Sequence, residues 1–131
     1  MIWNINFKIK LLVIILFSPT FSYANNTTLL GGNSKADGNE STALGYNTWA
    51  HSDQSTAIGA NAGAEGENAT AIGHRSTAIG DNALSLGSGA MAIGDGSLSE
   101  NATAIGHRST AIGDNALSLG SGAMAIGDGS L

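Results

Sequence analysis

Ser76-Thr77-Ala78-Ile79-Gly80-Asp81-Asn82, from the middle of the chain, is the unit from which the protein is built. It is a five-residue phrase that ends in glycine, followed by two polar linker residues. Every seventh position from Gly31 to Gly94 is glycine with one exception, Ser52, and after a jump in register the series resumes at Gly106. A fixed period of this kind indicates a repeat architecture rather than an ordinary globular domain.

A seven-residue period is also the period of a coiled coil, so this alternative has to be weighed first. A coiled coil needs apolar residues at two positions of each heptad and good helix formers between them. Here each heptad contains a glycine, which costs about 1 kcal/mol in a helix, and its Thr and Ile residues favour strands. The apolar positions within a phrase alternate by two, which is the strand period. The repeat therefore predicts short strands joined by turns of Gly, Asp, Asn and Ser.

The alternation divides the side chains of each phrase between two faces. The second and fourth residues before each glycine are small, mostly Ala or Ser, and we expect them to line the inside of a narrow, flattened coil. The residues directly before successive glycines alternate between apolar and polar: Leu30, Asp37, Leu44, His51, Ile58, Glu65 and Ile72. The true repeat is therefore fourteen residues long. One strand of each coil presents Leu or Ile outward, and its partner strand faces water.

The outward apolar strand predicts that the chain associates with copies of itself. A coil lined with Ala and Ser buries little apolar area, at about 25 cal/mol per Å², whereas ordering the backbone costs roughly 1–2 kcal/mol per residue. The chain has no cysteine, so disulfides cannot compensate. Packing the apolar stripes of several chains together would supply the missing core. The expected interface residues are Leu30, Leu44, Ile58, Ile72 and Leu86.

The N-terminus has the layout of a secretory signal peptide. Lys8 and Lys10 precede the apolar run LLVIILF at 11–17, and Ser22-Tyr23-Ala24 places small residues at a cleavage site. We therefore expect residues 1–24 to be removed and the remainder to be exported. The apolar run is too short for a membrane span, which needs about twenty residues, and no second apolar stretch follows it.

The composition of residues 25–131 excludes several classes of function. Three basic side chains stand against ten acidic ones, a net charge of −7, and nucleic acid would require a basic face. No catalytic triad or carboxylate pair stands out from the repeat, so we expect neither an enzyme nor a cofactor. Gly-Asp-Gly at 94–96 lacks the nonapeptide spacing of calcium-binding rolls. His74 fits an exposed turn residue better than a metal ligand.

The chain contains a perfect internal duplication. Residues 67–98 recur unchanged as residues 100–131, a period of 33 residues. Gly94 and Gly106 are twelve residues apart where fourteen are expected. Removing an even number of residues keeps every side chain on its own face, whereas an odd number would reverse them all. We expect a shortened turn or irregular coil at 95–101, with regular stacking on both sides of it.

The double phrase of fourteen residues resembles a known family. Ser-Thr-Ala-Ile-Gly alternating with Ala-Leu-Ser-Leu-Gly and Ala-Met-Ala-Ile-Gly (residues 76–94) is similar to the head repeats of YadA-like trimeric autotransporter adhesins. The resemblance implies an all-β, left-handed parallel β-roll that forms a homotrimer around its Ile and Leu strands. It implies further that the roll lies on the surface of a Gram-negative bacterium, binds host cells or extracellular matrix proteins, and mediates autoagglutination.

The resemblance covers residues 25–131 and not the other parts of such adhesins. Members of the family carry a neck, a coiled-coil stalk and a C-terminal membrane anchor, which do not follow here. We therefore expect an N-terminal fragment or a truncated gene product. As part of a longer protein it would lie at the cell surface or outer membrane, and otherwise it would be periplasmic or secreted.

The water-facing strands contain candidate contacts for a partner. Trp49 shares a phrase with His51, and an exposed Trp suits a binding surface, although it could instead cap an irregular early coil around Tyr46. Further along, these strands become apolar, which indicates either an adhesive surface or a place where another element covers the roll. The residues concerned are Ile79, Met91 and Ile93.

Two functions other than an adhesin head are compatible with the repeat. An ice- or surface-binding solenoid would use the regular array of Thr42, Thr56 and Thr70, but these residues share a strand with the Leu/Ile stripe and would be hidden in a trimer. A non-functional remnant of a truncated gene is the other alternative.

Overall fold

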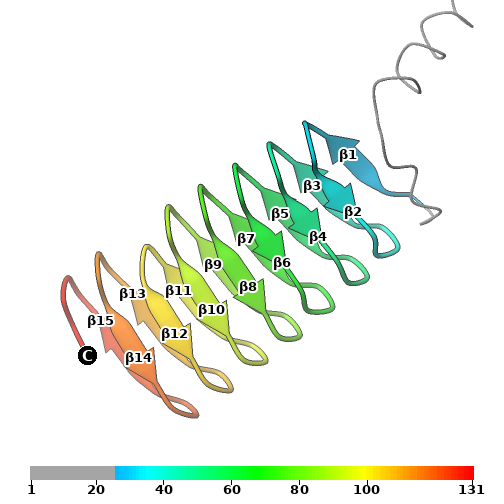
Figure 1. Cartoon of the computed structure of the whole chain (residues 1–131). Helices are drawn as coiled ribbons and strands as arrows, with labels where there is room; N and C mark the ends of the chain where they lie inside the picture. Colours follow the sequence, from blue (N-terminus) through cyan, green and yellow to red (C-terminus); the bar gives the residue numbers. More distant parts are fainter. Residues whose placement is uncertain (1–25) are drawn as a thin grey trace, which may run out of the picture.

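The computed structural model describes residues 26–131, so the signal peptide expected at 1–24 lies outside the described residues. Within that range fifteen short strands and no helix form a parallel β-solenoid of two sheets (Figure 1). Sheet A contains eight strands: β1 (Thr28–Leu30), β3 (Thr42–Leu44), β5 (Thr56–Ile58), β7 (Thr70–Ile72), β9 (Leu84–Leu86), β11 (Leu98–Glu100), β13 (Thr110–Ile112) and β15 (Met124–Ile126). Sheet B contains seven: β2 (Lys35–Ala36), β4 (Trp49–Ala50), β6 (Gly63–Ala64), β8 (Thr77–Ile79), β10 (Met91–Ile93), β12 (Thr103–Ile105) and β14 (Leu117–Leu119).

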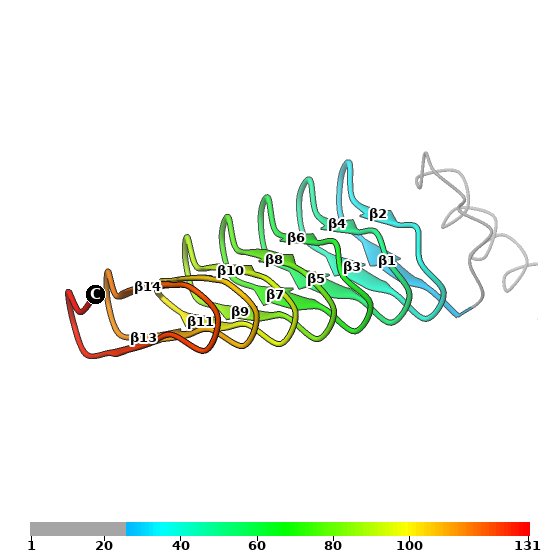
Figure 2. The same cartoon turned by 90° about the horizontal axis from the view of Figure 1, so that it is seen from below.

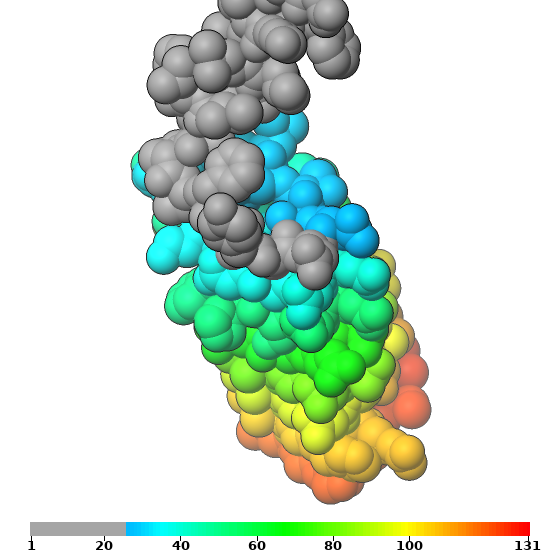
Figure 3. Space-filling model, turned by 90° about the vertical axis from the view of Figure 1, so that its right-hand side faces the viewer, coloured from blue at the N-terminus to red at the C-terminus, as the bar shows by residue number. Residues whose placement is uncertain are grey.

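Each coil consists of one strand from each sheet and two turns. Thr28 pairs with Thr42, fourteen residues further on, and the parallel register then repeats along the roll. Figure 2 shows the two sheets facing each other with turns along both edges, and Figure 3 shows the coils following one another in sequence order along a rod. The predicted parallel β-roll with about fourteen residues per coil is confirmed.

Small side chains fill the space between the sheets, as the alternation predicts. Ala43, Ala57 and Ala71 are fully buried, and the largest side chain that is less than 2% exposed is Thr48. Buried serines at the ends of turns donate to the backbone: the hydroxyl of Ser41 donates to the carbonyl of Gly38 at 2.6 Å. The interior is therefore thin, and apart from Leu29, which packs against it at the first coil, the larger Leu, Ile and Met side chains of the strands lie on the outer faces.

The turns explain why each phrase ends in glycine and is followed by Asn so often. The second linker residue adopts left-handed backbone angles, as at Asn61 (φ 59°) and Asn82 (φ 59°), a conformation that Asn tolerates better than most residues. The phrase-ending glycine lies against the next coil. At Gly59, where φ is 128°, a Cβ atom would lie 2.3 Å from the carbonyl oxygen of Gly73. Close stacking of coils therefore requires glycine at position 59.

One coil is shorter than the others. Met91 pairs with Thr103, twelve residues further on, because β11 and β12 are joined by only Asn101-Ala102. The corresponding connection between β9 and β10 has four residues, 87–90. The hydroxyl of Ser99, inside the coil, donates to the carbonyl of Ala102 across the short turn. The sheets continue through this point without interruption, and the expected irregularity at 95–101 takes the form of a shortened turn at its C-terminal end.

Candidate functional site

The outer face of sheet A carries a continuous column of large apolar side chains. Leu30, Leu44, Ile58, Ile72 and Leu86, the expected interface residues, are the third residues of β1, β3, β5, β7 and β9 and pair in register. In the single chain Leu30 and Ile72 are exposed, Ile72 by 38%, and the other three are half-buried. The structure therefore brings all five residues together on one surface.

This column, which we call the sheet A column, extends beyond Leu86 with one interruption. Its next members are Glu100, Ile112 and Ile126, because Glu100 pairs with Leu86 on one side and with Ile112 on the other. Glu100 is exposed, and it places a carboxylate in an otherwise apolar column. The first residues of the same strands form a second column, in which Thr28, Thr42, Thr56 and Thr70 are followed by Leu84 and Leu98.

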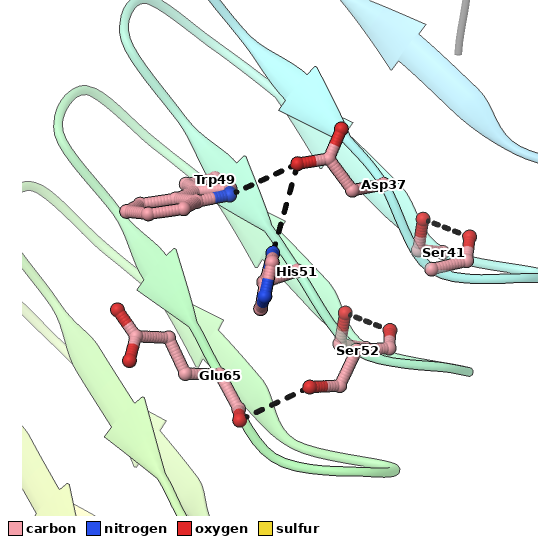
Figure 4. Close-up of polar contacts among 8 residues, drawn as sticks. Asp37, Ser41, Trp49, His51, Ser52 and Glu65 are labelled. Atoms are coloured by element: carbon pink, nitrogen blue, oxygen red, sulfur yellow. Dashed lines mark hydrogen bonds and ion pairs between the residues drawn. The ribbon is translucent and has the colours of Figure 1, made fainter.

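The first strands of sheet B present a polar face that includes Trp49 and His51. The indole Nε1 of Trp49 donates to Asp37 Oδ2 at 3.3 Å, and His51 Nδ1 lies 3.6 Å from the same oxygen (Figure 4). The rings of Trp49 and His51 meet edge to face, with centroids 5.3 Å apart. Both residues lie on the outside of the roll, and Trp49 is 43% exposed. Trp49 thus belongs to a regular strand, β4, and not to an irregular coil around Tyr46.

From β8 onward the outer face of sheet B is uncharged, and it is apolar except at Thr77 and Thr103. Ile79, Met91 and Ile93, predicted as contact residues, lie on β8 and β10 and pair in register. Their columns continue on β12 and β14 through Ile105, Leu117 and Leu119, of which Leu119 is 60% exposed. The roll therefore has one apolar face along its N-terminal half and two along its C-terminal half.

The second apolar face begins within the first copy, on β8 and β10, and the duplication extends it over β12 and β14. Thr70-Ala71-Ile72 lies in sheet A, and its identical copy Thr103-Ala104-Ile105 lies in sheet B. Likewise Leu84–Leu86 lies in sheet A and its copy Leu117–Leu119 in sheet B. The copies are 33 residues apart, and the short coil between them lacks two residues. Adding these two residues gives 35, which is five seven-residue phrases, an odd number. An odd number of phrases carries each copied strand to the opposite sheet.

The predicted apolar stripe ends at Leu86, and the predicted contacts do not include the apolar surface residues of the second copy. These residues are Ile105, Ile112, Leu117, Leu119, Met124 and Ile126. The signal was present in the sequence, in the parity of the number of phrases between the copies. The placement of these residues also depends on the short coil, which loses residues from one turn only and keeps successive strands alternating between the two sheets.

Carboxylates gather along the edge where sheet B strands turn into sheet A strands. Asp53 Oδ1 accepts from the backbone nitrogen of Asn39 at 2.9 Å, and Asp81 and Asp95 accept in the same way from the preceding coil at 3.1 and 3.2 Å. These side chains therefore act as links between coils. In the range 26–131 no three acidic or histidine side chains are placed to hold a metal ion. Within the same residues there is no helix long and apolar enough to cross a membrane.

Comparison with known proteins places this architecture in a family context. The family described as the YadA head domain repeat matches residues 25–48, 50–76, 73–97 and 104–130. The matched segments include strands of both sheets and both halves of the duplication. No curated protein matches the chain.

Proposed function

Since this chain belongs to the YadA head domain repeat family, we propose that it is the head of a cell-surface adhesin that attaches bacteria to host cells or to extracellular matrix proteins. In this role the chain binds other macromolecules and does not catalyse a reaction. The head is exported and displayed at the cell surface or outer membrane as part of a longer protein. Contacts between heads on neighbouring cells also support autoagglutination.

The observation that carries the proposal is the combination of the family match with an uncovered apolar face on a regular rod. The sheet A column leaves Leu30, Ile72 and Ile126 exposed in the single chain, while among residues 26–131 no fully buried side chain is larger than Thr. Apolar patches of this extent on a soluble protein mark interaction surfaces. We propose that three chains pack their sheet A columns around a common axis, with the number three taken from the family.

Packing through sheet A leaves sheet B for the partner. Sheet B then faces outward along the whole rod, with the polar Trp49 region in its N-terminal half and the apolar region from Ile79 onward in its C-terminal half. The threonine array of an ice-binding protein fits less well. The Thr column gives way to Leu84 after four residues, and it shares the face that the trimer would bury.

Assembly is tested with two substitutions in identical local sequences. Ile58 and Ile79 both end a Thr-Ala-Ile strand and are both half-buried, but Ile58 lies in sheet A and Ile79 in sheet B. In sedimentation velocity the unaltered protein is expected to be a trimer at micromolar concentration. Ile58→Glu should dissociate it, because burying an unpaired carboxylate is costly, and Ile79→Glu should not. A folded monomer for the unaltered protein would disprove the assembly.

Adhesion is tested separately. Beads coated with the protein should adhere to immobilised extracellular matrix proteins or to cultured cells, and uncoated beads should not. Thermal hysteresis of the freezing point, with no adhesion, would favour the ice-binding alternative. Absence of both activities in a properly folded protein would leave a gene remnant as the better interpretation.

A further inference from the structure

We propose that the outer face of β4 and β6 holds a binding site for a cationic side chain, an exposed arginine or lysine of a partner protein. The site consists of the indole of Trp49, the space over Gly63 and the carboxylate of Glu65. It deepens the proposed adhesin role by naming the chemistry that the polar half of sheet B recognises. The proposal rests on the adhesin role in one respect, namely that sheet B must face outward.

The indole of Trp49 is held in place before any ligand arrives. Its Nε1 donates to Asp37 on the preceding coil at 3.3 Å, and the His51 ring packs against it at a centroid distance of 5.3 Å. Trp49 nevertheless remains 43% exposed. A fixed and exposed aromatic ring binds with a smaller loss of side-chain entropy than a mobile one.

On the next coil, the position that lies beside Trp49 is a glycine and has no side chain. Gly63 pairs with Trp49 in register, and a Cβ atom at Gly63 would have nothing within 4 Å. Gly63 does not have the left-handed backbone angles that the turn glycines adopt, so neither the backbone nor the packing requires glycine here. The same position on the other strands of sheet B carries Lys, Trp, Thr, Met or Leu. The missing side chain opens a gap next to the indole.

The charges around this gap favour a cation. Glu65 follows Ala64 at the end of β6, its side chain is exposed, and Figure 4 shows it on the same side of the sheet as the indole of Trp49. Among residues 26–131 no Lys or Arg side chain lies within 4.0 Å of an acidic one, and the single contact of this kind joins Asp37 with His51, so Glu65 has no charged partner there. The nearby cation, Lys35, lies on β2, on the other side of Trp49.

Arginine and lysine match both parts of the site. A guanidinium or ammonium group over the face of Trp is attracted by the ring quadrupole, and Trp is the best of the aromatic side chains for this contact. The same group would reach the carboxylate of Glu65 across the gap. The net charge of −7 on residues 25–131 also steers basic partners toward the rod and anionic ones away from it.

Binding is tested with an acetylated and amidated hexaarginine peptide. The chain has two tryptophans, and Trp3 lies in the expected signal peptide, so a Trp3→Phe background assigns the fluorescence to Trp49 in protein that retains residues 1–24. Addition of hexaarginine should quench or shift the Trp49 emission, whereas hexaglutamate, hexaserine and an uncharged oligosaccharide should not. No response to hexaarginine would overturn the proposal, and so would a response to the oligosaccharide instead, which would indicate a sugar site.

The site is distinguished from general charge attraction by matched variants measured by calorimetry. Glu65→Gln should weaken hexaarginine binding by about twofold to fivefold, the size of an exposed ion pair, whereas Glu67→Gln removes the same charge in the adjacent turn and should have a smaller effect. Gly63→Leu should fill the gap and reduce binding similarly, and the fold accepts Leu there because Leu117 holds this position on β14. Equal losses for Glu65→Gln and Glu67→Gln would overturn the proposal.

Bead adhesion separates a failure of this site from a failure of the proposed function. If the site contributes to adhesion, beads coated with Gly63→Leu protein should bind a basic matrix protein less than unaltered beads do. If hexaarginine does not bind but the beads still adhere, the cation site is wrong and the adhesin role stands. If neither binds, the adhesin role itself fails.

Discussion

Ile72 and Ile105 occupy the same position in two identical segments of the chain and lie on opposite sheets of the roll. The shortened coil at Asn101-Ala102 keeps the winding intact, so the copied strand changes sheet without changing its inward and outward residues. Apolar strands of the first copy already lie on both sheets from β7 to β10, and the copied strands continue both faces to the C-terminal end of the roll. The C-terminal half of the rod therefore carries exposed apolar side chains on both sheets, among them Leu119 in sheet B and Ile126 in sheet A.

Glu100 offers a direct test of the sheet A column. Replacing it by Leu would join Leu86 to Ile112 in an unbroken apolar column. We expect Glu100→Leu to tighten self-association, by about 1–2 kcal/mol per chain for burial of one Leu, and to raise the midpoint of thermal unfolding.

The duplication supplies the control for this substitution. Glu67 has the same following sequence as Glu100 but lies in a turn between β6 and β7. Glu67→Leu should leave the association measured by sedimentation unchanged. If the two variants behave alike, sheet A is not the packing face at this level of the rod.

Two glycines of the same coil should respond differently to alanine. At Gly59 a Cβ atom would lie 2.3 Å from the carbonyl oxygen of Gly73, and φ is 128°. At Gly63 the same atom would have nothing within 4 Å. Gly59→Ala should therefore destabilise the roll by at least about 2 kcal/mol, measured by chemical denaturation. Gly63→Ala should be neutral or slightly stabilising, because it restricts only the unfolded chain.

Buried serines divide into paired and unpaired hydroxyls. Ser85 is fully buried and its hydroxyl has no hydrogen-bond partner among residues 26–131, whereas the hydroxyl of Ser41 donates to the carbonyl of Gly38 at 2.6 Å. Ser85→Ala should raise the free energy of unfolding by about 1 kcal/mol, because an unsatisfied buried hydroxyl is removed. Ser41→Ala should lower it by a similar amount. Thermal unfolding followed by circular dichroism would show shifts of opposite sign, and shifts of the same sign would contradict this account.

The short coil should accept two additional residues and reject one. Inserting Leu-Gly after Ser99 recreates the four-residue turn that joins β9 to β10 and restores a fourteen-residue coil. Stability should then be retained, and the new Leu would take the place of Glu100 in the sheet A column. A single Gly inserted at the same point should reverse the inward and outward residues that follow it. Hydrogen exchange should show lost protection confined to β12–β15 for the single insertion.

Much of the fold could be predicted from the sequence because the determinants are local. Each phrase contains what specifies its strand, its turn and its interior face: a glycine every seventh residue, small residues at alternate positions and polar linkers. The same pattern recurs in every phrase. The inward Ala57 and the outward Ile58 follow from a period of two. The alternation of Leu44, His51 and Ile58 was sufficient to give the fourteen-residue coil.

The tertiary structure decided what the repeat could not specify. Glu67 and Glu100 begin identical segments, but Glu67 lies in a turn and Glu100 ends a strand in the sheet A column. Their positions depend on how many residues the preceding coil contains, which is a property of stacking and not of local sequence. The gap over Gly63 also appears only when coils are stacked, because it is defined by Trp49, fourteen residues earlier in the chain. Sequence determined the coil, and the stacking of coils determined which side chains meet on its surface.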